Sequence, residues 1–134
     1  MQDLSPIFEI LQASPSRQRF KLKTEEILTL QEKGIDRILD QAWQMLERQL
    51  KPASPLHEGH QAPSRGEPVT IARHATALCC RKCMLRWHQI PRGRELSYVE
   101  MNYAMSVLRE WFYLQEFKLP KRVLPKKDPQ LRLF

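Results

Sequence analysis

Apolar residues recur at helical spacing through much of the first 50 residues. Between residues 36 and 50 they fall every three or four positions while the opposite face is charged, which predicts a helix with one side on a core. The same spacing predicts a short amphipathic helix over residues 3–12. Another helix is predicted over residues 24–33, because acidic side chains at its start suit the helix dipole and a glycine follows its end.

Two further elements are predicted after residue 68. Ser97 and Glu100 match a capping box, so a helix should run from there to about Phe117, with methionines and aromatic residues along its apolar face. Residues 69–72 (Val-Thr-Ile-Ala) form a short β-prone run that predicts one strand. The expected fold is therefore mainly α: a small helical domain with a Cys/His site and at most one or two short strands.

Prolines divide the chain into a domain and a tail. Ten prolines stand against four glycines, and most lie between residues 52 and 68 or after residue 119, where they predict loop and tail. We therefore predict a single helical domain over residues 1–117, with a Pro-rich loop at 52–68 and a Cys/His core at 69–96. Residues 118–134 are predicted to form a disordered basic C-terminal tail.

Composition narrows the class of protein. A chain of 134 residues that is 42% hydrophobic and 28% charged fits one globular domain. It has no apolar run of membrane length and no signal-peptide pattern after Met1, so a cytoplasmic protein without a membrane partner is expected. The formal net charge of +7 favours acidic partners such as nucleic acid.

All three cysteines lie within five residues, at 79, 80 and 83. An odd, clustered set is typical of a metal or redox site, whereas a disulfide framework uses dispersed pairs. Structural zinc takes four thiolate or imidazole ligands, and the best quartet is His74, Cys80, Cys83 and His88, with Cys79 as an alternative ligand. In a continuous helix, residues 83 and 88 would point about 140° apart, so either the helix breaks or only one of the two binds.

Other readings of the cluster stay open. Cys79, Cys83 and Trp87 would share one face of a helix, so the thiols can be simple core residues. An iron–sulfur centre would use the three cysteines and a histidine, and a thioredoxin-type pair would need a βαβ pattern that the sequence lacks. A haem attachment motif is excluded, because Met84 stands where it requires a histidine.

Five basic residues surround the cysteines and are candidate nucleic-acid contacts: Arg81, Lys82, Arg86, Arg92 and Arg94. They fall within fourteen positions that also contain a tryptophan. Basic clusters interleaved with aromatic residues are typical of phosphate and base contacts.

The central segment also resembles a known family. It carries His-Ala-Thr, Cys-Cys-Arg-x-Cys, Trp-His-x-Ile-Pro and Gly-Arg-Glu-Leu in that order, between residues 74 and 96. These pieces are similar to an uncharacterised family of small bacterial and phage proteins, domain-of-unknown-function family forty-one eighty-six. The resemblance extends from about Phe20 to Phe112 and departs at Glu67, where the family carries a histidine. It implies a shared site at His74, Cys80, Cys83 and His88, and names no reaction.

The last five residues form a second motif. Gln130-Leu131-Arg132-Leu133-Phe134 resembles the peptide by which bacterial replication and repair proteins dock on the DNA polymerase sliding clamp, Gln-Leu-x-Leu-Phe. Leu133 and Phe134 would be paired anchors in an apolar pocket, Leu131 would fill a smaller site, and Gln130 would supply hydrogen bonds.

These signals predict an accessory protein of DNA replication or repair that docks on the bacterial sliding clamp, with zinc as a structural cofactor and DNA as a further candidate partner. The alternatives are a zinc-dependent nuclease-like enzyme, a plain zinc-stabilised nucleic-acid-binding module, and a phage-type inhibitor of the clamp. No convergent carboxylate pair accompanies the cysteines, so the sequence favours a role without catalysis.

Overall fold

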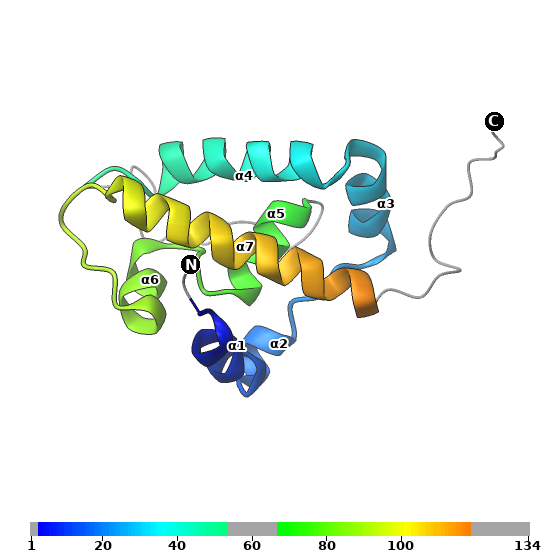
Figure 1. Ribbon diagram of the computed structural model, residues 1–134, viewed down its shortest axis with the longest axis horizontal. Coiled ribbons are helices and arrows are strands. Elements are labelled where there is room, and N and C mark those ends of the chain that lie inside the picture. Colours follow the sequence, from blue (N-terminus) through cyan, green and yellow to red (C-terminus); the bar gives the residue numbers. More distant parts are fainter. Residues whose placement is uncertain (1–2, 54–66, 119–134) are drawn as a thin grey trace, which may run out of the picture.

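Helices account for the regular structure of the described chain, which in this computed structural model comprises residues 3–53 and 67–118 (Figure 1). In chain order they are α1 (Ser5–Gln12), α2 (Pro15–Gln18), α3 (Thr24–Lys33), α4 (Ile35–Gln49), α5 (Pro68–Ala75), α6 (Arg81–His88) and α7 (Tyr98–Lys118). No strand occurs within those residues. The predicted mainly α fold is therefore confirmed.

The two longest helices run antiparallel along the long axis, with α5 packed between them and the N-terminal helices (Figure 1). Helix α5 contacts α2, α3, α4 and α7, so it lies at the centre of the domain. All eight of its residues are buried. Helices α1 and α2 cover the side of α5 opposite α4 (Figure 1).

The strand predicted at residues 69–72 is wrong, because these residues belong to α5. Their β-branched side chains suggested a strand, yet Pro68 sits at the first turn of the helix, where its fixed φ angle suits helical geometry. A helix that is covered on all sides shows no alternation of apolar and polar positions, so its sequence pattern cannot distinguish it from a buried strand.

The apolar faces predicted for the two long helices are confirmed. One face of α4 and one face of α7 are buried in the same core, α4 with Ile38, Leu39, Ala42 and Leu46, and α7 with Met101, Leu108, Trp111 and Phe112. Burying an aliphatic or aromatic side chain of this size contributes about 1.5–3 kcal/mol, so this interface supplies much of the driving force for folding.

Local signals position the helix ends. Gly34 alone separates α3 from α4, and its φ of 83° lies in the left-handed region that glycine adopts readily. At the start of α7, the Glu100 backbone N–H donates to Ser97 Oγ (3.1 Å), and the Ser97 backbone N–H donates to Glu100 Oε1 (2.9 Å). The predicted capping box is confirmed.

Among the residues that the structure describes, none of the helices is both long and apolar enough to cross a membrane. Most of the predicted Pro-rich loop lies outside the described residues. So does the predicted tail after Lys118, which includes the peptide Gln130–Phe134.

Candidate metal centre

Three thiols meet where the chain passes from α5 into α6. Cys79 and Cys80 precede α6, and Cys83 lies in its first turn. The Cys80 side chain caps the helix, since its Sγ accepts from the Cys83 backbone N–H (3.4 Å). The three sulfur atoms lie within 4.8 Å of one another, and the group can hold a metal ion. We call Cys79, Cys80 and Cys83 the cysteine cluster.

Arg17 approaches the cysteine cluster from the N-terminal part of the chain. Its Nη1 donates to the His74 carbonyl oxygen (2.8 Å) and to Cys79 Sγ (3.8 Å), and its Nη2 donates to Cys83 Sγ (3.4 Å). The guanidinium also lies over the Trp87 ring, 5.0 Å from its centroid. A positive charge held against sulfur by hydrogen bonds stabilises thiolate, so Arg17 is the counter-ion of the cluster.

The pKa values of Cys79 and Cys83 are shifted in opposite directions. The hydrogen bond from Cys83, and then the Arg17 guanidinium, lower the pKa of Cys79 to about 7, although burial opposes them. The hydrogen bond to Cys79 and burial raise the pKa of Cys83 above its ordinary range. At pH 8 without a metal, Cys79 is therefore the thiolate and Cys83 the thiol that donates to it.

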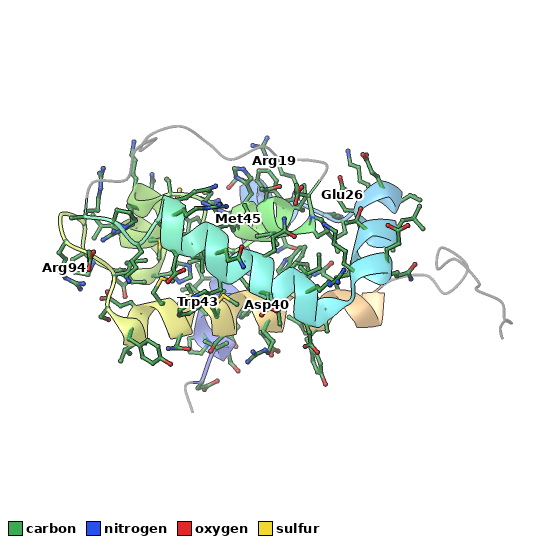
Figure 2. All side chains as sticks on the ribbon, turned by 90° about the horizontal axis from the view of Figure 1, so that it is seen from above. Arg19, Glu26, Asp40, Trp43, Met45 and Arg94 are labelled. Carbon is green, nitrogen blue, oxygen red and sulfur yellow. The ribbon has the colours of Figure 1, made fainter. Side chains whose placement is uncertain are left out.

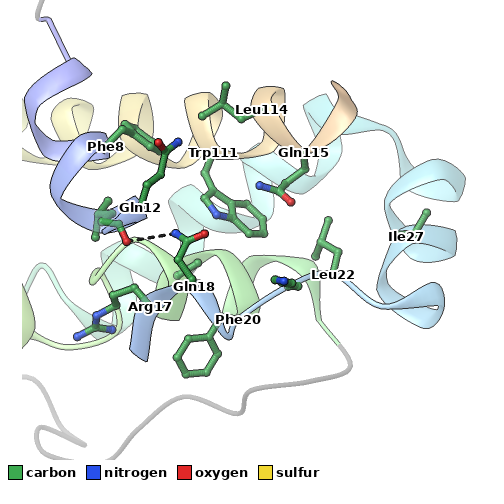
Figure 3. A pocket seen from close by; sticks show the side chains of 13 residues that line it. Phe8, Gln12, Arg17, Gln18, Phe20, Leu22, Ile27, Trp111, Leu114 and Gln115 are labelled. Atoms are coloured by element: carbon green, nitrogen blue, oxygen red, sulfur yellow. Dashed lines mark hydrogen bonds between the residues drawn. The ribbon is translucent and has the colours of Figure 1, made fainter. Parts of the chain in front are cut away.

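A pocket of about 360 Å³ lies on the other side of α2 (Figure 3). Aromatic side chains from α1, from the segment after α2 and from α7 line it, namely Phe8, Phe20 and Trp111. Arg17 is also among the lining residues, although its guanidinium points away from the pocket in Figure 3, and no cysteine lines it. The pocket and the cysteine cluster therefore share Arg17 but no sulfur atom.

Neither predicted histidine ligand joins the cysteine cluster. His88 Nε2 bonds to the Thr76 carbonyl oxygen (2.8 Å) and Nδ1 to the Tyr103 hydroxyl (2.7 Å). A carbonyl only accepts, so Nε2 carries the proton, and burial lowers the pKa of His88, which leaves Nδ1 to accept from the tyrosine. Helix α6 is continuous from Arg81 to His88, so the side chains of Cys83 and His88 diverge as helical geometry requires.

His74, the other histidine of the predicted quartet, is buried within α5. Its ring stacks on Phe20 at a centroid distance of 4.8 Å and an interplanar angle of 16°. Its backbone carbonyl oxygen accepts from Arg17, the residue that also bonds to Cys79 and Cys83. Of the predicted ligands, the structure brings together Cys80, Cys83 and the alternative Cys79.

The five candidate nucleic-acid residues divide into two groups. Lys82, Arg86 and Arg92 are exposed, and so is Arg94, which pairs with Glu100 through Nη2 and Oε2 (2.6 Å). Arg81 is different, because it is only 1% exposed. Its guanidinium donates to the carbonyl oxygens of residues 50, 52, 91 and 94. Arg81 therefore stabilises the fold, and its guanidinium is not accessible to a nucleic acid.

Sequence reasoning missed two arginines of the site, Arg17 and Arg73. Arg73 is 1% exposed, and its Nε and Nη2 donate to the carbonyl oxygens of Leu78 (3.1 Å) and Cys79 (3.0 Å), which fixes the backbone that presents Cys79. Gln49 Oε1 accepts from Nη1 (2.6 Å). The partners of Arg17 are distant in sequence and depend on how the helices pack, whereas Arg73 bonds to Leu78 and Cys79 close by in the chain without belonging to a recognised motif.

A family model described as "Domain of unknown function (DUF4186)" matches residues 5–113. The match extends the predicted resemblance toward the N-terminus, so that it includes α1, α2 and Arg17. A comparison with solved structures found no significant match.

Proposed function

The chain belongs to the DUF4186 family, to which no activity is assigned, and we propose that it is an accessory protein of bacterial DNA replication or repair that docks on the sliding clamp. The observation that carries this proposal is the peptide Gln130-Leu-Arg-Leu-Phe134. Leu133 and Phe134 would be buried as paired anchors, Leu131 would fill a smaller site, and Gln130 would hydrogen-bond to the clamp. Arg132 would face solvent.

The proposal agrees with the distribution of the core. The core residues of the described chain run from Phe8 to Phe112, so the described helices already share one hydrophobic core. Eleven residues separate the end of α7 from Gln130, and such a segment spans at most about 40 Å. Because ordering a short peptide costs conformational entropy, an affinity on the order of micromolar is expected.

Titration of the purified full-length chain into bacterial sliding clamp by calorimetry tests this proposal. We expect Leu133→Ala/Phe134→Ala to weaken binding by at least about tenfold, because buried apolar anchors carry most of such an interface. Arg132→Ala is the matched control within the same peptide and should change the affinity by less than about threefold. Undiminished clamp binding after removal of residues 130–134 would reject the proposal.

We further propose that the cysteine cluster binds zinc as a structural ion. Tetrahedral zinc with Zn–S bonds of about 2.3 Å separates its sulfurs by roughly 3.8 Å, so a small contraction from the present spread suffices. Three thiolates and Zn²⁺ carry a net charge of −1, which the adjacent Arg17 offsets. Water or a group outside the described residues would complete the coordination. Elemental analysis of the purified protein is expected to give one zinc per chain, and iron with visible absorbance would refute zinc.

A further inference from the structure

Two stretches of the chain without Asp or Glu, residues 10–24 and 68–94, meet at the cysteine cluster. Arg17 joins them, since it bonds to Cys83 and stacks on Trp87 of α6. The first stretch contributes four basic residues (Arg17, Arg19, Lys21 and Lys23) and the second contributes six arginines and lysines. The elements that Arg17 joins therefore carry many basic residues and no acidic one.

Not all of this charge reaches the surface. Arg73 and Arg81 are buried, and Arg94 pairs with Glu100. Lys82 and Arg86 are exposed and four residues apart in α6, so they share one face of the helix. Arg19 is exposed at the end of α2 and lies over Phe20 at 4.8 Å; in Figure 2 it projects at the edge of the molecule away from α7. We call these three exposed cations, Arg19 at the end of α2 and Lys82 and Arg86 on α6, the basic surface.

We propose that the basic surface binds the phosphate backbone of duplex DNA. This inference deepens the proposed function and rests on it for the partner, because the clamp encircles duplex DNA. Cations on two elements that a shared contact holds together suit a repeating row of phosphates. Arg17 lies over the ring of the nearby Trp87 and competes with a base for stacking there, which favours a duplex over a single strand as the partner.

Docking on the clamp and binding to DNA would reinforce each other. The clamp would hold the domain beside the duplex, so weak phosphate contacts would act at a high effective concentration. The DNA contacts alone should show the affinity of non-specific binding, about 1–100 μM at physiological salt.

Fluorescence anisotropy of a labelled duplex, without the clamp, tests the inference with the full-length protein. The variant Arg19→Gln/Lys82→Gln/Arg86→Gln removes three exposed charges. Because each phosphate contact contributes about 0.9 to the slope of log affinity against log salt, we expect the slope to fall by about 2 to 3 and the affinity by at least about tenfold. The control Lys33→Gln/Arg37→Gln/Arg48→Gln removes the same charge from exposed positions of α3 and α4, and it should bind within about threefold of the parent chain.

Three outcomes would overturn the inference. Equal losses in both variants would mean that only net charge matters. A larger loss in Lys121→Gln/Lys126→Gln/Lys127→Gln would assign DNA binding to the tail segment. Tighter binding to an unpaired strand than to the duplex would contradict the choice of partner. Each outcome is separate from clamp docking, which the titration above measures without DNA.

Discussion

Arg17 and Cys83 are joined across 66 residues of sequence by a hydrogen bond of 3.4 Å from Nη2 to Sγ. The same guanidinium reaches Cys79 Sγ and the His74 carbonyl oxygen. The N-terminal part of the chain is therefore attached to the cysteine cluster through one side chain, and the positive charge of that side chain helps to lower the pKa of Cys79.

Replacement of Arg17 should make Cys79 less acidic. In the metal-free protein, Arg17→Met removes both the hydrogen bond and the positive charge that stabilise the Cys79 thiolate, so the pKa of Cys79 should rise from about 7. The rate of iodoacetamide alkylation at Cys79, followed by mass spectrometry of its peptide, gives the midpoint. Arg37→Met, an exposed arginine of α4, should leave the midpoint in place. An unchanged midpoint in Arg17→Met would contradict the assigned role of Arg17.

The stability of the metal-free, reduced protein should rise and then fall with pH. The folded-state pKa of Cys79, about 7, lies below its usual value of 9.0, so between these values the unfolded chain binds more protons and the free energy of unfolding increases with pH. Above pH 9.0, Cys83 keeps its proton in the folded state and loses it in the unfolded state, so stability declines. Urea unfolding from pH 6 to 11 in the presence of chelator measures the profile. Cys79→Ser should remove the rise, and a rise that persists in this variant would point to another group.

Zinc content should depend on Cys83 and not on His88. Cys83→Ser removes one of three converging sulfurs and should lose most of the bound metal, whereas His88→Gln disturbs hydrogen bonds to Thr76 and Tyr103 outside the cysteine cluster. Elemental analysis of both variants, with circular dichroism to verify helicity, distinguishes the two. A helical but zinc-free His88→Gln protein would favour the predicted quartet of His74, Cys80, Cys83 and His88.

Arg81 should be the most costly arginine of α6 to replace. Arg81→Met would leave one buried and three partly buried carbonyl oxygens without this donor, so we expect a loss of about 3 kcal/mol in the free energy of unfolding. Arg86→Met, on the exposed side of the same helix, should change stability by less than about 0.5 kcal/mol. Chemical denaturation of the two variants makes the comparison, and similar losses would show that the buried bonds of Arg81 add little.

The elements that the sequence predicts correctly are the helices with one solvent-exposed face. The spacing of apolar residues in α4 and the capping box of α7 are local signals, and both predicted the correct element. Helix α5 is buried on every side and shows no amphipathic pattern, so its β-branched residues suggested a strand, and the proline at its first turn was the local signal for a helix. The conformation of this segment depends on its packing against elements that are distant in sequence.

In the candidate metal centre, too, the sequence predicts residues whose partners are close in the chain and misses Arg17, whose partners are distant. The Cys-x-x-Cys spacing alone identified Cys80 and Cys83 as candidate ligands, since a short turn places them together. His88 is equally close in sequence, but the rotation along a continuous helix turns it toward Tyr103. The partners of Arg17 lie 57 to 66 residues away, so no local pattern could identify it.

The bonds of Arg81 bear on how the domain opens locally. This side chain ties the end of α4 to the segment between α6 and α7, and the Leu96 backbone N–H adds a bond to the Lys51 carbonyl oxygen (2.9 Å). Release of either segment requires the loss of bonds on both sides. Backbone amides around residues 50 and 96 should therefore exchange hydrogen through one cooperative opening, as a single foldon that includes the N-terminal turn of α6.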